Sequence, residues 1–176
     1  ANKGWAIEAK APLLTPLVAG KLLGLNEEQL EQAVGISGSH GFVLGILDTD
    51  GEEYSMTKNI RFARTAHSGL MAAYMARRGF TGPRRVIEGH MGFAQVIMGG
   101  DFDPEALKMD GGRYCIEDVY FKLFSADGTN MGHLSATYDL ITRHNIRPED
   151  VARVQLRVSK RCVQHCAGHE KMNPTT

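Results

Sequence analysis

The chain has 176 residues, of which 43% are hydrophobic, so it can bury a real core as one domain or as two small ones. This composition excludes a disordered chain. The 20 basic and 20 acidic residues give a formal net charge of +0, which excludes broad electrostatic attraction to nucleic acid or to an anionic membrane. Any anion-binding site must therefore be local.

The location of the protein is predicted from what the sequence lacks. No apolar run reaches the roughly 20 residues needed to span a bilayer, and residues 1–5 are not typical of a signal peptide. Three cysteines, an odd number, do not form a disulfide framework and fit a reducing compartment. We therefore expect a cytoplasmic protein.

Two short helices are predicted in the first part of the chain. The first, within residues 11–23, is rich in Ala, Leu and Val and begins near one of two prolines. The second begins after Asn26, a typical N-cap residue, and Gln29 completes a capping box. The short connection predicts a helical hairpin. Residues 35–51, rich in Gly, Ser and Asp, predict a loop or broken helix of the kind that often borders a site.

The longest predicted helix follows residues 55–61 and ends at Gly79. Its apolar residues recur every three or four positions, which predicts one buried stripe, made of Ile60, Ala63, Leu70, Met71, Tyr74 and Met75. Ser55 or Thr57 is the candidate N-cap. His67 falls in line with the stripe, so we expect a partly buried histidine rather than a catalytic one.

The second half of the sequence predicts a mixture of helices and strands. Helices are expected at residues 93–98 and 130–144, with one further turn near residue 104. Residues 114–123 alternate imperfectly between apolar and polar side chains and predict a strand. Residues 151–158 alternate regularly and predict a half-buried antiparallel strand.

These elements predict an α+β fold class. A mainly helical N-terminal part is expected at residues 1–82, and an α+β lid-type module at residues 83–176. The boundary is placed at residues 79–83, where glycine and proline predict turns.

Lys58 lies in a basic segment at the start of the longest predicted helix, with Arg61 and Arg64 following at helical spacing. Backbone N–H groups at a helix N-terminus already favour anions, so a cation there either faces water or lies in a site that receives an anionic ligand. A solvated surface charge is the commoner outcome. A lysine in such a place can also act in proton transfer.

Two further residues are candidates for chemistry. Lys122 lies between aromatic residues, whose apolar side chains could desolvate its ammonium group, although a solvent-facing lysine is the commoner outcome. His133 lies in the first turn of a predicted helix, where the helix dipole opposes a positive ring. A neutral histidine there could act as a base or a hydrogen-bond donor, and an exposed surface histidine is the alternative.

A cluster near the end of the sequence raises the possibility of zinc binding. Cys162, His165, Cys166 and His169 offer two thiols and two imidazoles. Their spacing differs from the common zinc patterns, and no second pair of ligands occurs elsewhere. We therefore expect no bound metal.

The order of several motifs resembles the MmgE/PrpD family, which includes 2-methylcitrate dehydratase, cis-aconitate decarboxylase and iminodisuccinate epimerase. The resemblance covers nearly the whole chain. It rests on residues 20–25, 27–30, 33–39, 56–58, 66–69, 78–83, 88–89, 92–93 and 121–122 and on His133.

The resemblance implies a cofactor-independent lyase or isomerase that acts on a small di- or tricarboxylate, often as a homodimer. Lys58 matches the lysine of the family's Met-Thr-Lys motif, Lys122 matches a lid lysine, and His133 matches a lid histidine. These three are the expected catalytic residues, with Thr57 and Arg61 binding substrate. Such chemistry needs cations to hold carboxylates and a group that removes the proton next to one of them.

The resemblance also implies that the sequence corresponds to a middle portion of a longer family member. A histidine that family members often carry is missing where this chain has Trp5, Ala6 and Ile7. The leading expectation is a dehydratase. The alternatives are a decarboxylase or epimerase of the same fold, or a truncated carboxylate-binding module without catalysis. The expected partners are the small carboxylate and either a second copy or the remaining part of the chain, with neither nucleic acid nor membrane.

Overall fold

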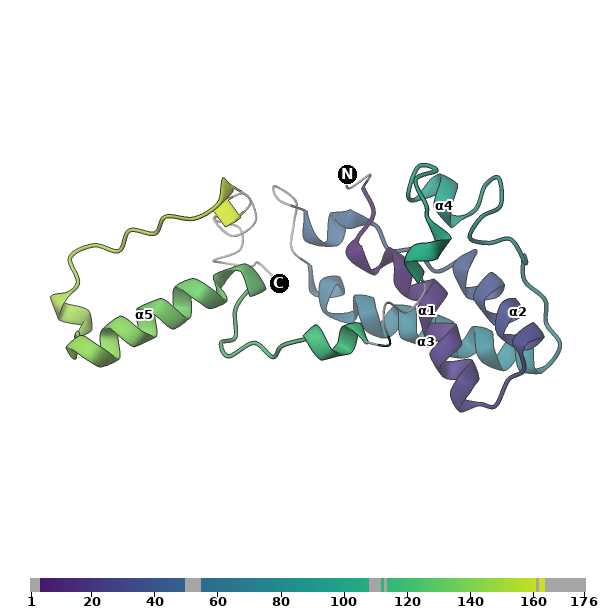
Figure 1. Ribbon diagram of the computed structural model, residues 1–176, viewed down its shortest axis with the longest axis horizontal. Coiled ribbons are helices and arrows are strands. Elements are labelled where there is room, and N and C mark those ends of the chain that lie inside the picture. Colours follow the sequence, from purple (N-terminus) through teal and green to yellow (C-terminus); the bar gives the residue numbers. More distant parts are fainter. Residues whose placement is uncertain (1–3, 50–54, 108–111, 113, 161, 164–176) are drawn as a thin grey trace. The chain divides into compact units, whose positions relative to one another are not determined.

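The structure is a computed structural model that describes residues 4–49, 55–107, 112, 114–160 and 162–163. The chain forms two compact units, Ala1–Glu105 and Ala106–Asn173. Each unit is described by itself below. Unit 1 contains the helices α1 to α4 at the purple to teal end of the colour scale, and unit 2 contains α5 in green (Figure 1).

Unit 1 is a helical bundle with short 3-10 turns at its edges. Its elements are η1 (Ile7–Lys10), α1 (Ala11–Leu22), α2 (Glu27–Gly38), η2 (Gly45–Asp48), η3 (Met56–Ile60), α3 (Arg61–Arg77) and α4 (Phe93–Val96), and η4 (Pro104–Leu107) follows at its end. Helices α1, α2 and α3 each pack against the other two. The core therefore lies where these three helices meet.

The predicted helical hairpin of α1 and α2 is confirmed. Asn26 Oδ1 accepts a hydrogen bond from the Gln29 backbone N–H at 2.9 Å, and the Asn26 N–H donates to Gln29 Oε1 at 3.1 Å. This capping box satisfies two amide groups that the first turn of a helix leaves without partners. The hairpin turns at Gly24, whose φ of +71° favours glycine.

The predicted buried stripe of α3 is wrong. The buried residues of α3 are small: Thr65, Gly69, Ala72, Ala73 and Ala76. The larger residues of the predicted stripe, including Leu70, Met71 and Tyr74, lie on the other side of the helix and are exposed, as is His67. Helix α3 therefore packs through a face of small side chains, because its neighbours approach too closely for large ones.

Gly69 shows how close this approach is. A Cβ atom added at Gly69 would lie 2.6 Å from Thr15 Cβ and 2.8 Å from the backbone N of Pro16, both in α1. The Thr15 hydroxyl also donates a hydrogen bond to the Thr65 carbonyl at 3.2 Å. The backbones of α1 and α3 thus lie in near contact, and the hydrophobic cluster of Leu25, Ala33, Ala73 and Ala76 fills the space toward α2.

The segment after α3 turns back over α2. Gly79 has a φ of +84° at the end of α3, as the sequence predicts. The Gly82 N–H then donates to Oε1 of the buried Gln32 at 2.9 Å. Further along, the rings of Phe93 and Phe42 lie 5.7 Å apart, and Trp5 lies 6.0 Å from Phe42. These ring contacts connect α4 to the start of the chain.

The described part of unit 2 contains one α-helix and several short 3-10 turns. Its elements are η5 (Cys115–Asp118), η6 (Gly128–Asn130), α5 (Met131–His144) and η7 (Pro148–Asp150). The predicted helix near residues 130–144 is confirmed, and it ends at Asn145 in the left-handed conformation, with a φ of +48°. None of the residues of α5 is buried.

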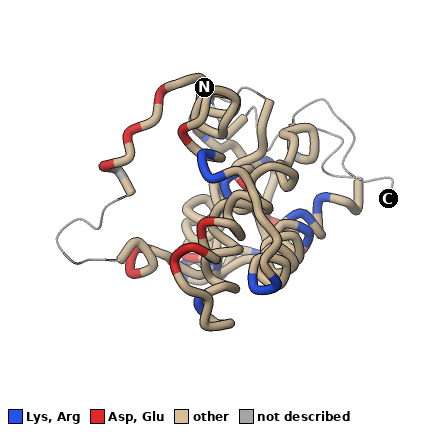
Figure 2. Tube along the Cα trace, turned by 90° about the vertical axis from the view of Figure 1, so that its right-hand side faces the viewer, with Lys and Arg blue, Asp and Glu red and all other residues tan. Residues whose placement is uncertain are grey.

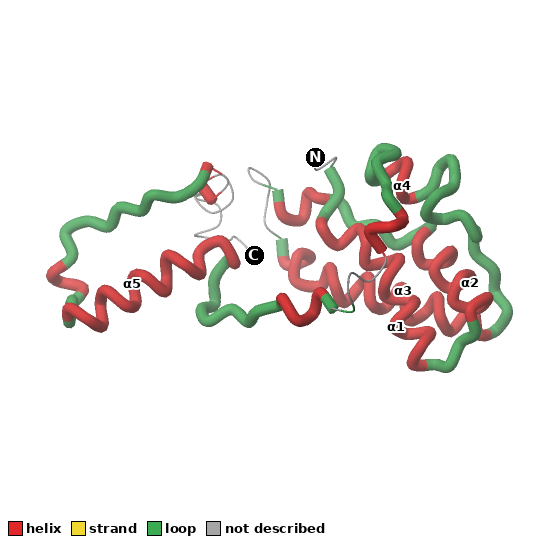
Figure 3. Tube along the Cα trace, viewed as in Figure 1, coloured by secondary structure: helices red, strands yellow, loops and turns green. Residues whose placement is uncertain are grey.

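The predicted α+β fold class is wrong for the described part of the chain. Residues 114–123 contain a 3-10 turn, and residues 151–158 run as irregular chain (Figure 3). Across the described ranges no named strand occurs, and the lone β-bridge joins Trp5 to Leu44 in unit 1. An alternating pattern becomes a strand only when a partner accepts its backbone hydrogen bonds. Among the residues that the structure describes, no such partner pairs with either segment, and Val154 and Leu156 are exposed.

Basic and acidic residues, which are equal in number in the sequence, both occur in the described part of the chain. Lys and Arg (blue) and Asp and Glu (red) both occur along the traced chain (Figure 2). None of the helices among the described residues is long and apolar enough to cross a membrane.

The close packing of α1 and α3 predicts that Gly69→Val destabilises unit 1. The added side chain meets backbone and Cβ atoms of α1, so we expect a loss of about 1–3 kcal/mol in the free energy of unfolding, the usual cost of overpacking. Ala66→Val, at an exposed position of the same helix, is the matched control and should cost roughly 0.5 kcal/mol through helix propensity alone. Urea denaturation followed by circular dichroism measures both. Equal losses in the two variants would contradict the close packing.

Candidate functional site

The predicted Met-Thr-Lys segment forms η3 and runs directly into α3. The Lys58 N–H donates to the Ser55 carbonyl at 3.1 Å, which closes the 3-10 turn. Ser55 makes no side-chain cap, so the predicted N-cap role of Ser55 or Thr57 is wrong. Lys58 is half-buried and Thr57 is exposed. Element η3 also packs against η2, so the predicted loop region does border Lys58's segment.

Arg61, the first residue of α3, forms an ion pair with Glu8 of η1. Arg61 Nε lies 2.9 Å from Glu8 Oε1, and the side chain of Glu8 is 0% exposed while that of Arg61 is 18% exposed. Neither carboxylate oxygen has a well-directed hydrogen bond among the described residues, so the attraction is one of charge rather than of hydrogen-bond geometry. The Arg61 guanidinium also lies over the Phe62 ring, 5.6 Å from its centre.

The position of Glu8 complements two helices at once. Element η1 leads directly into α1, and neither α1 nor α3 has an acidic residue in its first turn. A carboxylate near a helix N-terminus is favourable because the helix dipole is positive there. The Glu8 carboxylate thus compensates a cation at the start of α3 that is otherwise unfavourably placed.

Lys122 and His133 lie in unit 2. Lys122 is exposed, and so are its neighbours Phe121, at 93%, and Leu123, at 82%. These apolar side chains therefore do not desolvate Lys122 within unit 2. His133 lies in the first turn of α5, as predicted, and is half-buried. Its carbonyl accepts a hydrogen bond from the Thr137 hydroxyl at 2.8 Å.

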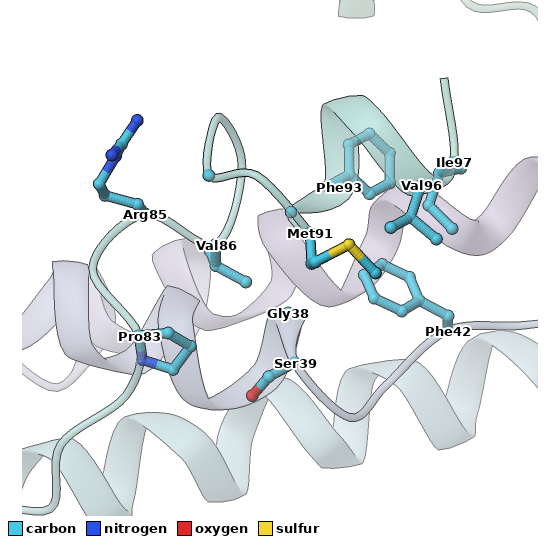
Figure 4. Close-up of a pocket in the computed structure, with 12 residues that line it drawn as sticks. Gly38, Ser39, Phe42, Pro83, Arg85, Val86, Met91, Phe93, Val96 and Ile97 are labelled. Atoms are coloured by element: carbon cyan, nitrogen blue, oxygen red, sulfur yellow. The ribbon is translucent and has the colours of Figure 1, made fainter. Parts of the chain in front are cut away.

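A hollow of about 330 Å³ lies between the end of α2, the loop after it and the segment around α4 (Figure 4). Its lining is mostly apolar and includes Phe42, Val86, Met91, Phe93, Val96 and Ile97. Arg85 is the cation on its border, and it is exposed and paired with Glu88 at 3.3 Å. None of the five predicted site residues lines this hollow, and its apolar walls do not suit a di- or tricarboxylate.

The sequence predicts that the cysteine and histidine cluster near residues 162–169 does not bind zinc. The structure describes only part of this cluster. Cys162 is buried, and its thiol lies 3.8 Å from Asn130 Oδ1. His165, Cys166 and His169 lie outside the described residues. Elsewhere in the described ranges, no three His, Cys, Asp or Glu residues are grouped so that they could hold a metal ion.

Comparison with known families identifies the helical unit. Residues 13–105, more than half of the chain, match the MmgE/PrpD N-terminal domain. The chain belongs to the MmgE/PrpD family. The resemblance predicted from the motifs is confirmed, and the family includes dehydratases. No protein of curated function matches the sequence.

The MmgE/PrpD match ends at residue 105, the residue at which unit 1 also ends. The family domain and the compact helical unit therefore share this boundary. Thr57, Lys58 and Arg61 lie within the matched residues, whereas Lys122 and His133 lie beyond them.

Glu8 is the site residue that sequence reasoning missed. It precedes the matched residues and belongs to none of the quoted motifs. The one available signal is a carboxylate between the apolar residues Ile7 and Ala9, since a charge in an apolar segment that becomes buried needs a partner. The partner lies far along the chain, so the sequence does not name it.

The buried ion pair predicts that Arg61→Met destabilises unit 1. Removing the guanidinium leaves the Glu8 carboxylate buried without a counter-charge, and we expect a loss of about 3–5 kcal/mol in the free energy of unfolding. Arg64→Met removes an exposed arginine from the same turn of α3 and should change this free energy by about 0.5 kcal/mol or less. Chemical denaturation of the two variants measures the difference. A loss as small in Arg61→Met as in Arg64→Met would show that the pair contributes little.

Proposed function

We propose that this MmgE/PrpD chain functions as a cofactor-independent lyase of the 2-methylcitrate dehydratase type, which acts on a small di- or tricarboxylate. The observation that carries the proposal is the Met-Thr-Lys motif, at the start of α3 inside the family domain. Its lysine is half-buried, in a segment with three cations between residues 58 and 64. A local concentration of positive charge in an otherwise neutral protein supports binding of an anion.

In the proposed reaction a base removes the proton from the carbon next to a carboxylate. The electron pair of the broken C–H bond forms the new C=C bond, and the C–O bond to the hydroxyl group breaks. The hydroxide leaves as water after it takes up a proton. Negative charge builds on the carboxylate as the C–H bond breaks, and a nearby ammonium group stabilises it.

Lys58 is assigned to a substrate carboxylate or to the proton, with Thr57 and Arg61 as its neighbours in the binding segment. Arg61 is already paired with Glu8. The negative charge of Glu8 therefore offsets part of the attraction between Arg61 and an anionic substrate. Lys122 and His133 of unit 2 are assigned the same kinds of role, as carboxylate ligand and as proton donor or acceptor.

Two further expectations accompany the proposal. The family resemblance favours a homodimer, or pairing with the remaining part of a longer family chain. The exposed apolar residues of α3 support a contact with another protein surface. The cysteine content favours a cytoplasmic location. Mass measured by light scattering after size-exclusion chromatography tests the first expectation, and a monomeric mass at micromolar concentration would contradict a homodimer.

The assignment of Lys58 predicts that Lys58→Ala abolishes the reaction. Loss of an ammonium group that holds the developing charge is expected to lower kcat/KM about 100-fold or more for 2-methylcitrate or citrate. Lys122→Ala is expected to act in the same direction. Lys21→Ala, an exposed lysine of α1, is the matched control and should leave the rate unchanged. Formation of the unsaturated product, followed by its ultraviolet absorbance, measures the rate.

The same assay separates the alternatives. Turnover that survives both Lys58→Ala and Lys122→Ala would remove the proposed mechanism. Release of CO₂ without a dehydrated product would favour a decarboxylase, and inversion at a carbon without loss of a group would favour an epimerase. Citrate binding by calorimetry without turnover would favour the carboxylate-binding module.

A further inference from the structure

The start of α3 concentrates positive charge where a helix tolerates it least. Lys58, Arg61 and Arg64 lie within seven residues, and the first turn of α3 contains no acidic residue. Residue Ile60 at the N-cap position makes no side-chain cap. Cations at this end of a helix oppose its dipole. Some other part of the molecule must hold this junction in place.

Element η3 is short and makes no side-chain cap of its own. It is a five-residue 3-10 turn, its N-cap residue Ser55 makes no side-chain cap, and its C-cap residue is Arg61. Short 3-10 turns have poorer hydrogen-bond geometry than α-helices and gain little stability of their own. Because Arg61 is both the C-cap residue of η3 and the first residue of α3, a contact that fixes Arg61 also restrains the turn that carries Lys58.

Arg61 is held by the Glu8 carboxylate, which arrives from η1. The two charged atoms are 2.9 Å apart, and the carboxylate has no exposed surface. Element η1 also packs against α3. A buried charge with one counter-charge is strongly tied to it, because separating the two leaves an uncompensated charge out of water.

We propose that Glu8 is a positioning residue for Lys58. It acts through Arg61: by neutralising and anchoring the residue shared by η3 and α3, it fixes the turn that carries Lys58 three residues earlier. The inference rests on the function proposed above, because Lys58 is the residue whose placement matters there. It adds a residue outside the family match and outside the quoted motifs.

The variant that tests this is Glu8→Gln, which keeps the shape of the side chain and removes its charge. Hydrogen exchange of the backbone amides in residues 57–60 should become about tenfold faster, as expected when one charge-assisted contact of typical strength is lost. Amides of the buried core, such as that of Ala33 in α2, should exchange as in the wild type. Faster exchange throughout unit 1 by one common factor would indicate only lower global stability and would overturn the inference.

A matched control and a rescue sharpen the test. Glu28→Gln breaks the exposed ion pair of Arg84 and Glu28, 3.2 Å long in the same unit, and should leave residues 57–60 unaffected. The double variant Glu8→Gln with Arg61→Gln replaces the ion pair by a neutral pair that can hydrogen-bond, so it should recover most of the lost protection. Should Glu8→Gln fail to fold, the double variant decides: protection near the wild-type value, or faster exchange confined to residues 57–60, supports the inference, and faster exchange throughout unit 1 by one common factor overturns it.

Citrate binding measured by calorimetry connects the inference to function. Glu8→Gln should weaken citrate binding about tenfold, matching the loosened turn. Lys58→Ala should abolish binding while leaving the exchange of residues 57–60 near the wild-type rate. If Lys58→Ala binds citrate normally, the proposed function fails. The exchange data then still test whether Glu8 holds residues 57–60 in place. If Lys58→Ala loses binding but Glu8→Gln changes neither exchange nor binding, the inference alone fails.

Discussion

The ion pair between Glu8 and Arg61 is the contact on which the basic end of unit 1 depends. It joins the turn before α1 to the first residue of α3, and it does so with a carboxylate that has no exposed surface. Two helices thereby begin near one negative charge, although neither carries an acid in its own first turn. The arrangement stabilises both dipoles with one residue. It also makes the junction sensitive, since loss of Arg61 leaves the Glu8 carboxylate buried without this counter-charge.

Helices α1, α2 and α3 of unit 1 pack closely because the buried residues of α3 are small. Gly69, Ala72, Ala73 and Ala76 let α3 lie against its neighbours with almost no side-chain volume between the backbones. The buried cluster at these residues contains one large side chain, Leu25, and partly buried hydrophobic residues pack around it. The large side chains of α3 remain on the outer face. Helix α3 thus has two faces that can pack, one by close approach and one by apolar area, and the first is the one that unit 1 uses.

The sequence predicts local features well and distant ones poorly. The capping box at Asn26, the ends at Gly79 and Asn145 and the helix positions all follow from residues a few places apart, and the structure has them. The face that α3 buries depends on how close α1 comes, which no periodicity contains. The alternating residues 151–158 satisfy the local condition for a strand, but a strand also needs a distant partner. Glu8 was missed for the same reason: its partner is 53 residues away.

The hollow beside α4 and the junction of η3 and α3 differ in charge. The hollow beside α4 is apolar, and its bordering Arg85 already faces Glu88, so a di- or tricarboxylate there would lose its water without gaining a counter-charge. The junction of η3 and α3 has cations beside the N-terminus of a seventeen-residue helix. An anion gains from both the ammonium of Lys58 and the helix dipole. For a carboxylate substrate, the energetics therefore favour the junction over the hollow.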